Sequence, residues 1–346
     1  EIIKDLLRTF PNDSSFQRGS VCYQKLFNII TFLFCASAAF GQIGGESVYP
    51  FLGLSTSSDY ASMGGACPSV DVAGVNSLTS NPALVDTTDN LAAALNMVSY
   101  VAGIGYGSAF YGGRVGKTMV SGGAELVNYG EFALTDEAAN ELGTFRCRDY
   151  MLVASAARHI WDSLPLTVGV SMKSIFSKME TYHSTGIAFD FGLRYYIEKQ
   201  KITVGLAVLN LGCQLTTYSD NTHEKLPLDI RLGISKQLLH APLRFTLTVH
   251  DLQKPKLADD FGRSLANHLT FSAELFPQGV VSLKGGFDAM AHNDLYVTDG
   301  SVFPGFSFGV DVRLKRISVQ YSRQCISPAA SANMFTVELM IGKMMR

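Results

Sequence analysis

The sequence predicts an all-β protein, a transmembrane antiparallel β-barrel of about 14 strands with an N-terminal hatch segment. Apolar and polar residues alternate with a period of two along many stretches of the chain. Charged residues make up only 17% of the sequence, against about 25% in ordinary soluble proteins. Gly, Phe and Tyr occupy 32, 22 and 14 positions. Short and long connections alternate between the predicted strands, which is typical of bacterial outer-membrane barrels.

The hairpin at residues 186–212 shows the alternation most clearly. Odd positions from Ile187 to Tyr195 are aromatic or aliphatic, and the even positions between them are Gly, Ala or isolated charges. The alternation resumes at Ile202 after the charged turn EKQK, which predicts two strands joined as a hairpin. The polar face of a soluble sheet carries long solvated side chains. Small residues with isolated charges are instead typical of a crowded barrel interior, with lipid against the apolar face.

Residues 1–41 are predicted to be an upstream extension followed by a signal peptide. The apolar segment 26–41 follows basic residues and ends in Ala39-Phe40-Gly41, a small-x-small cleavage site. Maturation would begin at Gln42. A buried helix is the alternative, and the Gly-rich stretch that follows at once argues against it.

Residues 42–90 are predicted to form the hatch, folded into the mouth or lumen of the barrel. This stretch is rich in small residues and has no sustained period of two. Asn81, Pro82 and Ala83 form its motif and are expected in a turn or a short capped helix. A flexible periplasmic tail is the alternative. The hatch is preferred because several large apolar side chains need burial: Tyr49, Phe51, Leu52, Leu54 and Met63.

Residues 91–346 are predicted to form the barrel. The expected strands cover residues 91–100, 104–113, 117–129, 148–160, 165–178, 185–197, 201–213, 226–238, 242–251, 266–276, 279–290, 305–314, 317–324 and 333–342. Segments of this length cross a membrane when tilted. An even number of strands returns both ends of the barrel to the same side of the membrane.

The predicted connections orient this barrel. The short ones are GRVGK, WDSLP, EKQK, LHAP, PQG and KR, and the long ones are 130–147, 179–184, 214–225, 252–265, 291–304 and 325–332. We expect short periplasmic turns, long extracellular loops and two periplasmic termini, in the outer membrane of a Gram-negative bacterium. Aromatic residues near the strand ends predict two interfacial girdles, with Tyr129, Tyr182 and Tyr218 near the loops and Trp161, Tyr195 and Tyr196 near the turns.

Charges of both signs are predicted to face the lumen. They are Asp190, Arg194, Asp229, Arg231, Arg244, Asp311 and Arg313, together with Glu274, Lys284, Asp288, Lys315 and Glu338. A solute-selective channel usually carries rings of one sign. The mixture predicts ion pairs with the wall and the hatch, hence a plugged or narrow barrel rather than an open porin.

No catalytic or cofactor motif emerges from the sequence. GGRVGKT at 112–118 has three residues between its outer glycines where a phosphate-binding loop needs four. The seven histidines lack metal-ligand spacing. The net charge of −2 gives no basis for a nucleic-acid partner. We therefore expect a protein that is not an enzyme and has no cofactor, metal or nucleic-acid partner, with outer-membrane lipid around it.

Four cysteines remain after the predicted cleavage, namely Cys67, Cys147, Cys213 and Cys325. An exported protein permits disulfides. Four cysteines allow three pairings, and free thiols are equally admissible.

Several stretches in order resemble the PorQ family, outer-membrane components of the type IX secretion system of Bacteroidota. They are GGESVYPFL at 44–52, DYASMGGA at 59–66, NPAL at 81–84, NYGEF at 128–132 with TDE at 135–137, and LPLDIRLGISKQLLHAPLRFTLTVHDLQK at 226–254. NPAL alone is similar to the hatch of the broader group of long-chain fatty-acid transporter barrels. One departure is the final Arg346, where barrels commonly end in an aromatic residue.

The resemblance implies a role in surface attachment, in one complex with a PorU-like sortase, a PorV-like barrel and a PorZ-like surface protein. The first hypothesis is thus a non-catalytic scaffold whose extracellular loops, near 130–147, 214–225, 252–265 and 291–304, bind the surface protein. The alternative is an outer-membrane transporter of hydrophobic small molecules that uses the hatch and a lateral opening in the wall. An outer-membrane enzyme is the third possibility.

Overall fold

The computed structural model describes most of the chain from residue 47 onward. The described ranges are 47–70, 74–85, 91–100, 103–136, 138, 140–161, 164–218, 223–258, 260–295, 304–327 and 330–341. The upstream extension and signal peptide expected over residues 1–41 lie outside the described residues. Residues 45–346 form one compact unit.

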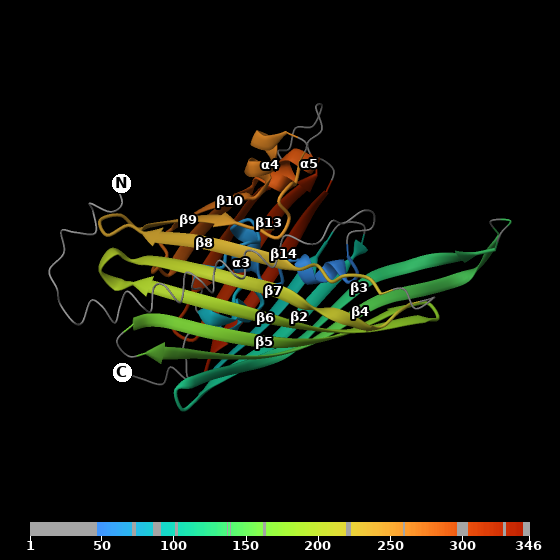
Figure 1. The fold of residues 1–346 in the computed structure, drawn as a ribbon, viewed down its shortest axis with the longest axis horizontal. Helices are drawn as coiled ribbons and strands as arrows, with labels where there is room; N and C mark the ends of the chain where they lie inside the picture. Colours follow the sequence, from blue (N-terminus) through green and yellow to red (C-terminus); the bar gives the residue numbers. More distant parts are fainter. Residues whose placement is uncertain are drawn as a thin grey trace, which may run out of the picture. The chain divides into compact units, whose positions relative to one another are not determined.

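The described strands form a closed antiparallel barrel of fourteen strands (Figure 1). Each strand pairs with its sequence neighbours, and β1 closes the barrel by pairing with both β2 and β14. The predicted fold class is confirmed. The strands are β1 (Leu91–Ser99), β2 (Gly105–Val115), β3 (Thr118–Thr135), β4 (Glu141–Trp161), β5 (Leu164–Met179), β6 (Tyr182–Ile197), β7 (Ile202–Thr216), β8 (Asp229–Gln237), β9 (Leu243–Val249), β10 (Leu269–Leu275), β11 (Val281–Asp288), β12 (Phe306–Arg313), β13 (Ile317–Ser327) and β14 (Ala330–Met340).

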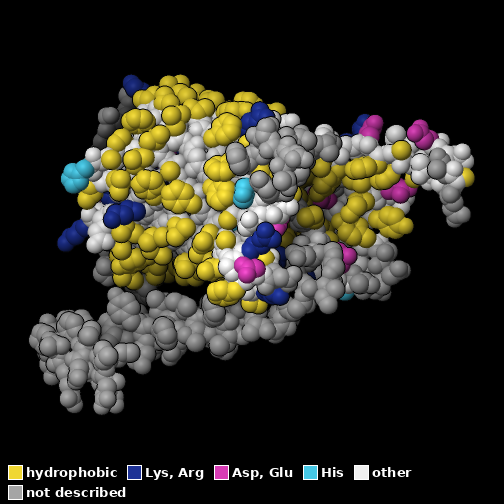
Figure 2. Space-filling model, turned by 90° about the horizontal axis from the view of Figure 1, so that it is seen from above, with side chains coloured by type: hydrophobic (Ala, Val, Ile, Leu, Met, Phe, Trp, Pro, Cys, Tyr) yellow, Lys and Arg dark blue, Asp and Glu magenta, His cyan; other side chains and the backbone are white. Residues whose placement is uncertain are grey.

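Side chains alternate between the two sides of the wall. In β6, Phe189 and Phe191 are 38% and 46% exposed, whereas Asp190 between them is fully buried. The period of two in the sequence therefore separates an apolar exterior from the interior. Figure 2 shows apolar side chains over most of the visible face of the barrel, which suits a lipid environment. Among the described residues, no helix is long and apolar enough to cross a membrane.

The two ends of the barrel differ. The turns β2–β3, β6–β7, β8–β9, β10–β11 and β12–β13 gather at one end, called the turn end below. The opposite end, called the loop end, carries α4 (Phe261–Asn267) between β9 and β10 and α5 (Ala289–Leu295) between β11 and β12 (Figure 1).

Two of the predicted long loops are wrong. Glu180 adopts a positive φ of 53°, which permits a tight turn, so Met179 pairs with Tyr182 and nothing of 179–184 remains as a long loop. Pairing also continues to Ser327 and Ala330 in the region predicted as the loop 325–332. Strict alternation of short and long connections is therefore not observed.

The predicted loop 130–147 is mostly strand. β3 runs to Thr135 and β4 starts at Glu141, since Glu131 pairs with Arg146 and Phe132 with Phe145 after a bulge. β2 pairs with β3 only as far as Asn128, and β5 pairs with β4 only as far as Cys147. Residues 131–135 and 141–146, the β3–β4 extension, therefore project beyond their neighbouring strands (Figure 1).

The described residues of the hatch pack against the inner wall of the barrel. It comprises η2 (Pro50–Gly53), α3 (Ser58–Ser62), η3 (Val75–Thr79) and η4 (Pro82–Leu84). α3 contacts β11–β14, η3 contacts β1–β3 and η4 contacts β4–β6. Tyr49, Phe51 and Met63 are almost fully buried, while Leu52 and Leu54 are partly buried.

The girdle prediction needs a correction at the loop end. Tyr129 donates a hydrogen bond to Asp149, and Tyr218 donates one to Ser177, so both hydroxyls bond to side chains buried inside the barrel. Tyr182 is 51% exposed, as expected for an interfacial residue.

Candidate functional site

The hatch motif holds two parts of the hatch to the wall. The Asn81 side chain accepts a hydrogen bond from the Ala83 amide at 2.9 Å, which caps η4. Its amide nitrogen donates to the Pro68 carbonyl at 2.7 Å and lies within 3.2 Å of the Leu193 carbonyl of β6. Asn81 therefore fixes η4, the Pro68 segment and the wall relative to one another.

Inward-facing glycines leave the space in which Asn81–Ala83 and Pro68 lie against the wall, and a contact of this kind is called a glycine seat below. A Cβ added at Gly169 or Gly192 would overlap the backbone or side chains of Asn81–Ala83. A Cβ at Gly205 would overlap the Pro68 carbonyl. Glycine allows this close approach because it has no side chain. Gly192 and Gly205 of the 186–212 hairpin thus allow close contact with the hatch.

A second seat holds the other side of the hatch. A Cβ at Gly286 of β11 would overlap the backbone at Met63, and one at Gly309 of β12 would lie 2.6 Å from Ser62 Cβ. Ser307 donates a hydrogen bond to the Ser62 carbonyl at 3.0 Å. Contacts on opposite sides of the barrel therefore fill this level of the lumen with hatch backbone.

A charge network links α3 to β9–β12. Lys284 forms an ion pair with Asp59 of the hatch and lies 3.6 Å from Asp311. Arg313 pairs with Asp311 at 2.6 Å and reaches Glu274 at 3.4 Å. Asp59, Lys284, Asp311 and Glu274 are each at most 5% exposed. Because charges in such surroundings need partners, the network stabilises the seated hatch.

Two further polar contacts lie beside this network, one on β9 and one on β14. Arg244 of β9 lies 3.3 Å from Glu274. Glu338 of β14 accepts a hydrogen bond from the Asn76 side chain of the hatch at 2.7 Å. A polar cleft beside these groups, lined in part by Glu338 and Gln320, has room for about one water molecule.

A separate buried pair lies in β5–β7. Lys173 Nζ is 2.8 Å from Asp190 Oδ2 and donates to Asn210 at 2.7 Å. Asn210 has a φ of 61° within a bulge, and its backbone N–H donates a hydrogen bond to the Asp190 carboxylate at 2.8 Å. The bulge interrupts the β6–β7 ladder beside Asp190.

An apolar cluster shares the rest of the interior wall with polar side chains. Inward side chains from β1–β6 pack with Val48, Tyr49 and Phe51 of the hatch in one buried cluster. Its members on these strands are Ala92, Ala94, Val98, Tyr106, Phe110, Met119, Val127, Met151, Val153, Ala157, Ile175 and Ala188, and Ala332 and Met334 of β14 belong to the same cluster. Buried polar side chains lie on the same strands, among them Asn96, Ser121, Asp149 and Ser171. Among the described residues, the Oε1 atom of Glu125 is buried without a hydrogen-bond partner. The lumen thus holds one large apolar cluster, and polar or charged groups lie on both of its sides.

The predicted lumen charges other than Lys315 lie on inward-facing positions. Asp190 belongs to the pair with Lys173, whereas Arg244, Asp311 and Arg313 belong to the network around Lys284. Asp229 and Arg231 pair with each other at 2.5 Å nearer the loop end. The Arg194 guanidinium lies 5.7 Å from the ring centroid of Tyr196. Lys315 is wrong as a lumen residue, because it lies exposed in the β12–β13 turn.

Sequence reasoning missed several partners of these charges. Lys173 shares the inward parity of Ser171 and Ile175, so alternation within β5 could have identified it. Asp59 lies in a segment without periodicity, so only its contact with Lys284 reveals its role. Asn210 is shifted by a bulge that the alternation did not signal.

The cysteines are free thiols in the described part of the chain. Cys67 lies in the hatch and is fully buried, and burial raises the pKa of its thiol to about 12. A buried, protonated thiol does not react with thiol reagents. Labelling of Cys67 would therefore report that the hatch has moved away from the wall. Within the described ranges, no group of three His, Cys, Asp or Glu side chains is arranged to hold a metal ion.

Comparisons with known proteins support the barrel and leave its family open. No protein-family model matches the chain, and no curated protein matches it. The structure of the CymD monoaromatic hydrocarbon channel is similar, with a TM-score of 0.51 and 12% identity over 84% of this chain and 97% of that chain. At this identity the likeness shows the fold alone. Membership of the PorQ family therefore stays a prediction.

Two further solved structures have lower TM-scores. A deltaS2S3 mutant of the TodX monoaromatic hydrocarbon channel has a TM-score of 0.48 and 12% identity over 81% of this chain and 97% of that chain. A Pseudomonas aeruginosa FadL homologue has a TM-score of 0.46 and 11% identity over 82% and 97% of the two chains.

Proposed function

We propose that this chain is an outer-membrane transporter of hydrophobic small molecules, which pass between the hatch and the wall of β1–β6. The apolar cluster between the hatch and this part of the wall carries the proposal. Apolar side chains of β1–β6 pack with Val48, Tyr49 and Phe51 of the hatch, whereas Asp59 of the hatch forms a buried ion pair with Lys284 of β11. A hydrophobic molecule gains free energy along the first surface and would have to separate buried charges along the second. The likeness in fold to a structure described as a monoaromatic hydrocarbon channel also supports transport of hydrophobic molecules.

Passage requires the hatch to shift, because glycine seats hold its backbone against the wall on both sides. The charged contacts of α3 make that side the fixed one, and the apolar contacts of η3 with β1–β3 make the other side easier to part. The bulge at Asn210 interrupts the wall next to Ala188 of the apolar cluster, which suits a lateral opening into the membrane.

Uptake by whole cells tests the proposal, with toluene as the probe and a deletion strain as the background. Val127 is fully buried in the apolar cluster, and its neighbour Leu126 is 43% exposed on the outer face. Val127→Phe should narrow the route and slow toluene accumulation about tenfold, while the matched Leu126→Phe should leave it unchanged. Equal uptake by the deletion strain and the complemented strain would refute transport.

A scaffold of the type IX secretion system is the second candidate function. The folded loop end favours it, because α4, α5 and the β3–β4 extension give the barrel ordered surfaces beyond the wall. In this role the loops would hold a PorZ-like surface protein in a complex with PorU-like and PorV-like components. A deletion strain should then release secreted cargo from its surface. Full retention of cargo in that strain would contradict the scaffold role.

Both functions place the chain in the outer membrane of a Gram-negative bacterium, one of the Bacteroidota in the second case, with the loop end outside and both termini periplasmic. Cysteines introduced at Lys256 in the β9–β10 loop and at Lys199 in the β6–β7 turn test this orientation. A membrane-impermeant maleimide should label position 256 on intact cells and position 199 only after lysis. The reverse pattern would invert the topology.

A further inference from the structure

The β3–β4 extension is a two-stranded ribbon with both edges unpaired. β2 stops opposite Asn128 and β5 stops opposite Cys147, and among the described residues no strand pairs with 131–135 or 141–146 from outside. Each edge therefore presents backbone N–H and C=O groups in the extended conformation. Such an edge is a template for an added strand.

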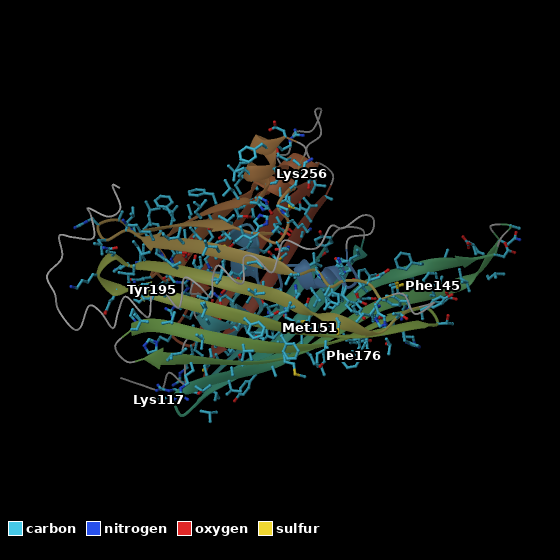
Figure 3. All side chains as sticks on the ribbon, in the orientation of Figure 1. Lys117, Phe145, Met151, Phe176, Tyr195 and Lys256 are labelled. Carbon is cyan, nitrogen blue, oxygen red and sulfur yellow. The ribbon has the colours of Figure 1, made fainter. Side chains whose placement is uncertain are left out.

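The apolar side of this ribbon continues the interior side of the barrel. Phe145 has the same parity in β4 as Cys147 and Asp149, which are buried. Its ring stacks on that of Phe132 at a centroid distance of 5.6 Å, and Phe132 is 44% exposed. Figure 3 shows Phe145 far out on the projecting ribbon. Lipid surrounds the opposite face of the wall, so it does not cover this pair.

The other side of the ribbon argues against a place in the hydrocarbon. Arg146 pairs with Glu131 there, and both side chains are more than half exposed. Charged side chains on the lipid face of a barrel are costly inside the membrane and tolerated beyond it. The ribbon therefore stands in an aqueous layer with its apolar side uncovered, and an isolated two-stranded hairpin is marginal in water.

The ribbon is acidic, and hydrogen bonds hold its tip. Residues 131–146 include Glu131, Asp136, Glu137 and Glu141 but only one basic residue, Arg146. Asp136 accepts hydrogen bonds from the Asn140 side chain at 2.9 Å, from the Asn140 backbone amide at 2.8 Å and from the Ala138 backbone amide at 2.9 Å. These hydrogen bonds lower the pKa of the Asp136 carboxyl. A tip held in this way loses less entropy on binding. The net negative charge favours a basic partner.

We propose that the β3–β4 extension binds a basic, extended β-strand of another protein, which adds to an edge of the ribbon where β2 or β5 stops. Main-chain hydrogen bonds continue the register of the barrel, apolar side chains of the added strand cover Phe132 and Phe145, and its basic residues meet the acidic tip. This inference specifies the contact for the scaffold role and rests on that candidate function. Transport through the lumen does not depend on it.

Binding of defined peptides to the purified barrel in uncharged detergent tests the proposal. The probe is a nine-residue peptide that alternates lysine and valine, labelled for fluorescence anisotropy. Its controls are a peptide alternating glutamate and valine and a Lys/Val peptide with a central proline, which removes a donor and disrupts strand pairing. The Lys/Val peptide should bind saturably, and each control should bind at least tenfold more weakly.

Two variants locate the binding site. Replacing residues 131–146 by Asn-Gly closes β3 and β4 with a two-residue turn and should reduce affinity at least tenfold. The milder Asp136→Asn/Glu141→Gln variant keeps the ribbon and should weaken binding in a salt-dependent way. Val280→Ala, at a 64% exposed apolar residue of the β10–β11 turn at the opposite end of the barrel, is the matched control and should bind as the parent does. Heat-modifiable gel mobility checks that each barrel is folded.

Several results would overturn the proposal. They are a parent that does not bind the Lys/Val peptide, a shortened variant that binds as well as the parent, and equal affinity for the Glu/Val peptide. A photocrosslinker at position 132 that reacts with lipid in native membranes would also overturn it. Since none of these changes touches the hatch, uptake of toluene by the shortened variant separates failure here from failure of transport.

Discussion

Removal of Lys284 should release the hatch. Lys284 is 5% exposed and Asp59 is 1% exposed, and the two groups form an ion pair between the wall and α3. Lys284→Met keeps much of the side-chain volume and removes the charge. Asp311 retains Arg313 at 2.6 Å, whereas Asp59 loses its ion-pair partner from the wall. Breaking such a pair by removing one side costs about 3–5 kcal/mol.

This cost applies to the state in which the hatch is seated, because Asp59 regains water when the hatch moves. Each 1.4 kcal/mol corresponds to about a factor of ten. The population with a displaced hatch should therefore rise by roughly two to three and a half powers of ten.

Cys67 provides the assay, since it lies in the hatch and is fully buried. In a background with Cys147, Cys213 and Cys325 replaced by serine, the rate of maleimide labelling should rise in Lys284→Met by a comparable factor. Adding Asp59→Asn removes the orphaned charge and should restore slow labelling. The reasoning is refuted if Lys284→Met labels at the parental rate, or if the double variant labels as fast as the single one.

Three other changes give separate tests. Asn81→Ala removes the η4 cap and the bond to Pro68, at a cost of about 1–3 kcal/mol, and should speed Cys67 labelling; an unchanged rate would contradict the anchoring role. Gly192→Ala should destabilise the barrel in urea by about 1–3 kcal/mol, whereas Gly285→Ala, whose Cβ meets nothing closer than 3.8 Å, should be neutral; equal effects would count against the seat. Burial alone would raise the pKa of Asp251, but the hydrogen bond from His250 and nearby positive charges lower it. The Asp251 carboxylate therefore stabilises the folded protein fully at a pH above the pKa of an ordinary aspartate, about 3.9. This stabilisation is lost as the pH falls through the lowered pKa of Asp251 in the folded protein. Calorimetry should show that the difference in Tm between the parent and Asp251→Asn becomes smaller as the pH is lowered. A difference that becomes larger would contradict the lowered pKa.

Local alternation was sufficient to predict the wall. Phe189, Asp190 and Phe191 show why, because each inward or outward position in a strand follows from the residue beside it. The position of the hatch inside the barrel was expected because its large apolar side chains, such as Tyr49 and Phe51, need burial. Strand ends were harder to predict, because Glu180 adopts a positive φ and Phe132 pairs with Phe145 across a region that contains Gly and charges.

The contacts of the site depended on tertiary structure. Lys284 was predicted to face the lumen, but its ion pair with Asp59 joins residues far apart in the sequence, and nothing in the hatch composition selects Asp59. The glycines at 192 and 205 were recognised as small inward residues. That they seat Asn81 and Pro68 follows only from the position of the hatch.

A reversible lock between hatch and wall tests transport most directly. Ser69 Oγ of the hatch and Ser235 Oγ of β8 are 2.7 Å apart, so cysteines at both positions can form a disulfide with little movement. In a Cys67→Ala background, the oxidised Ser69→Cys/Ser235→Cys variant should lose toluene uptake, and reduction should restore it. Uptake that is the same in the oxidised and reduced protein would contradict passage past a moving hatch.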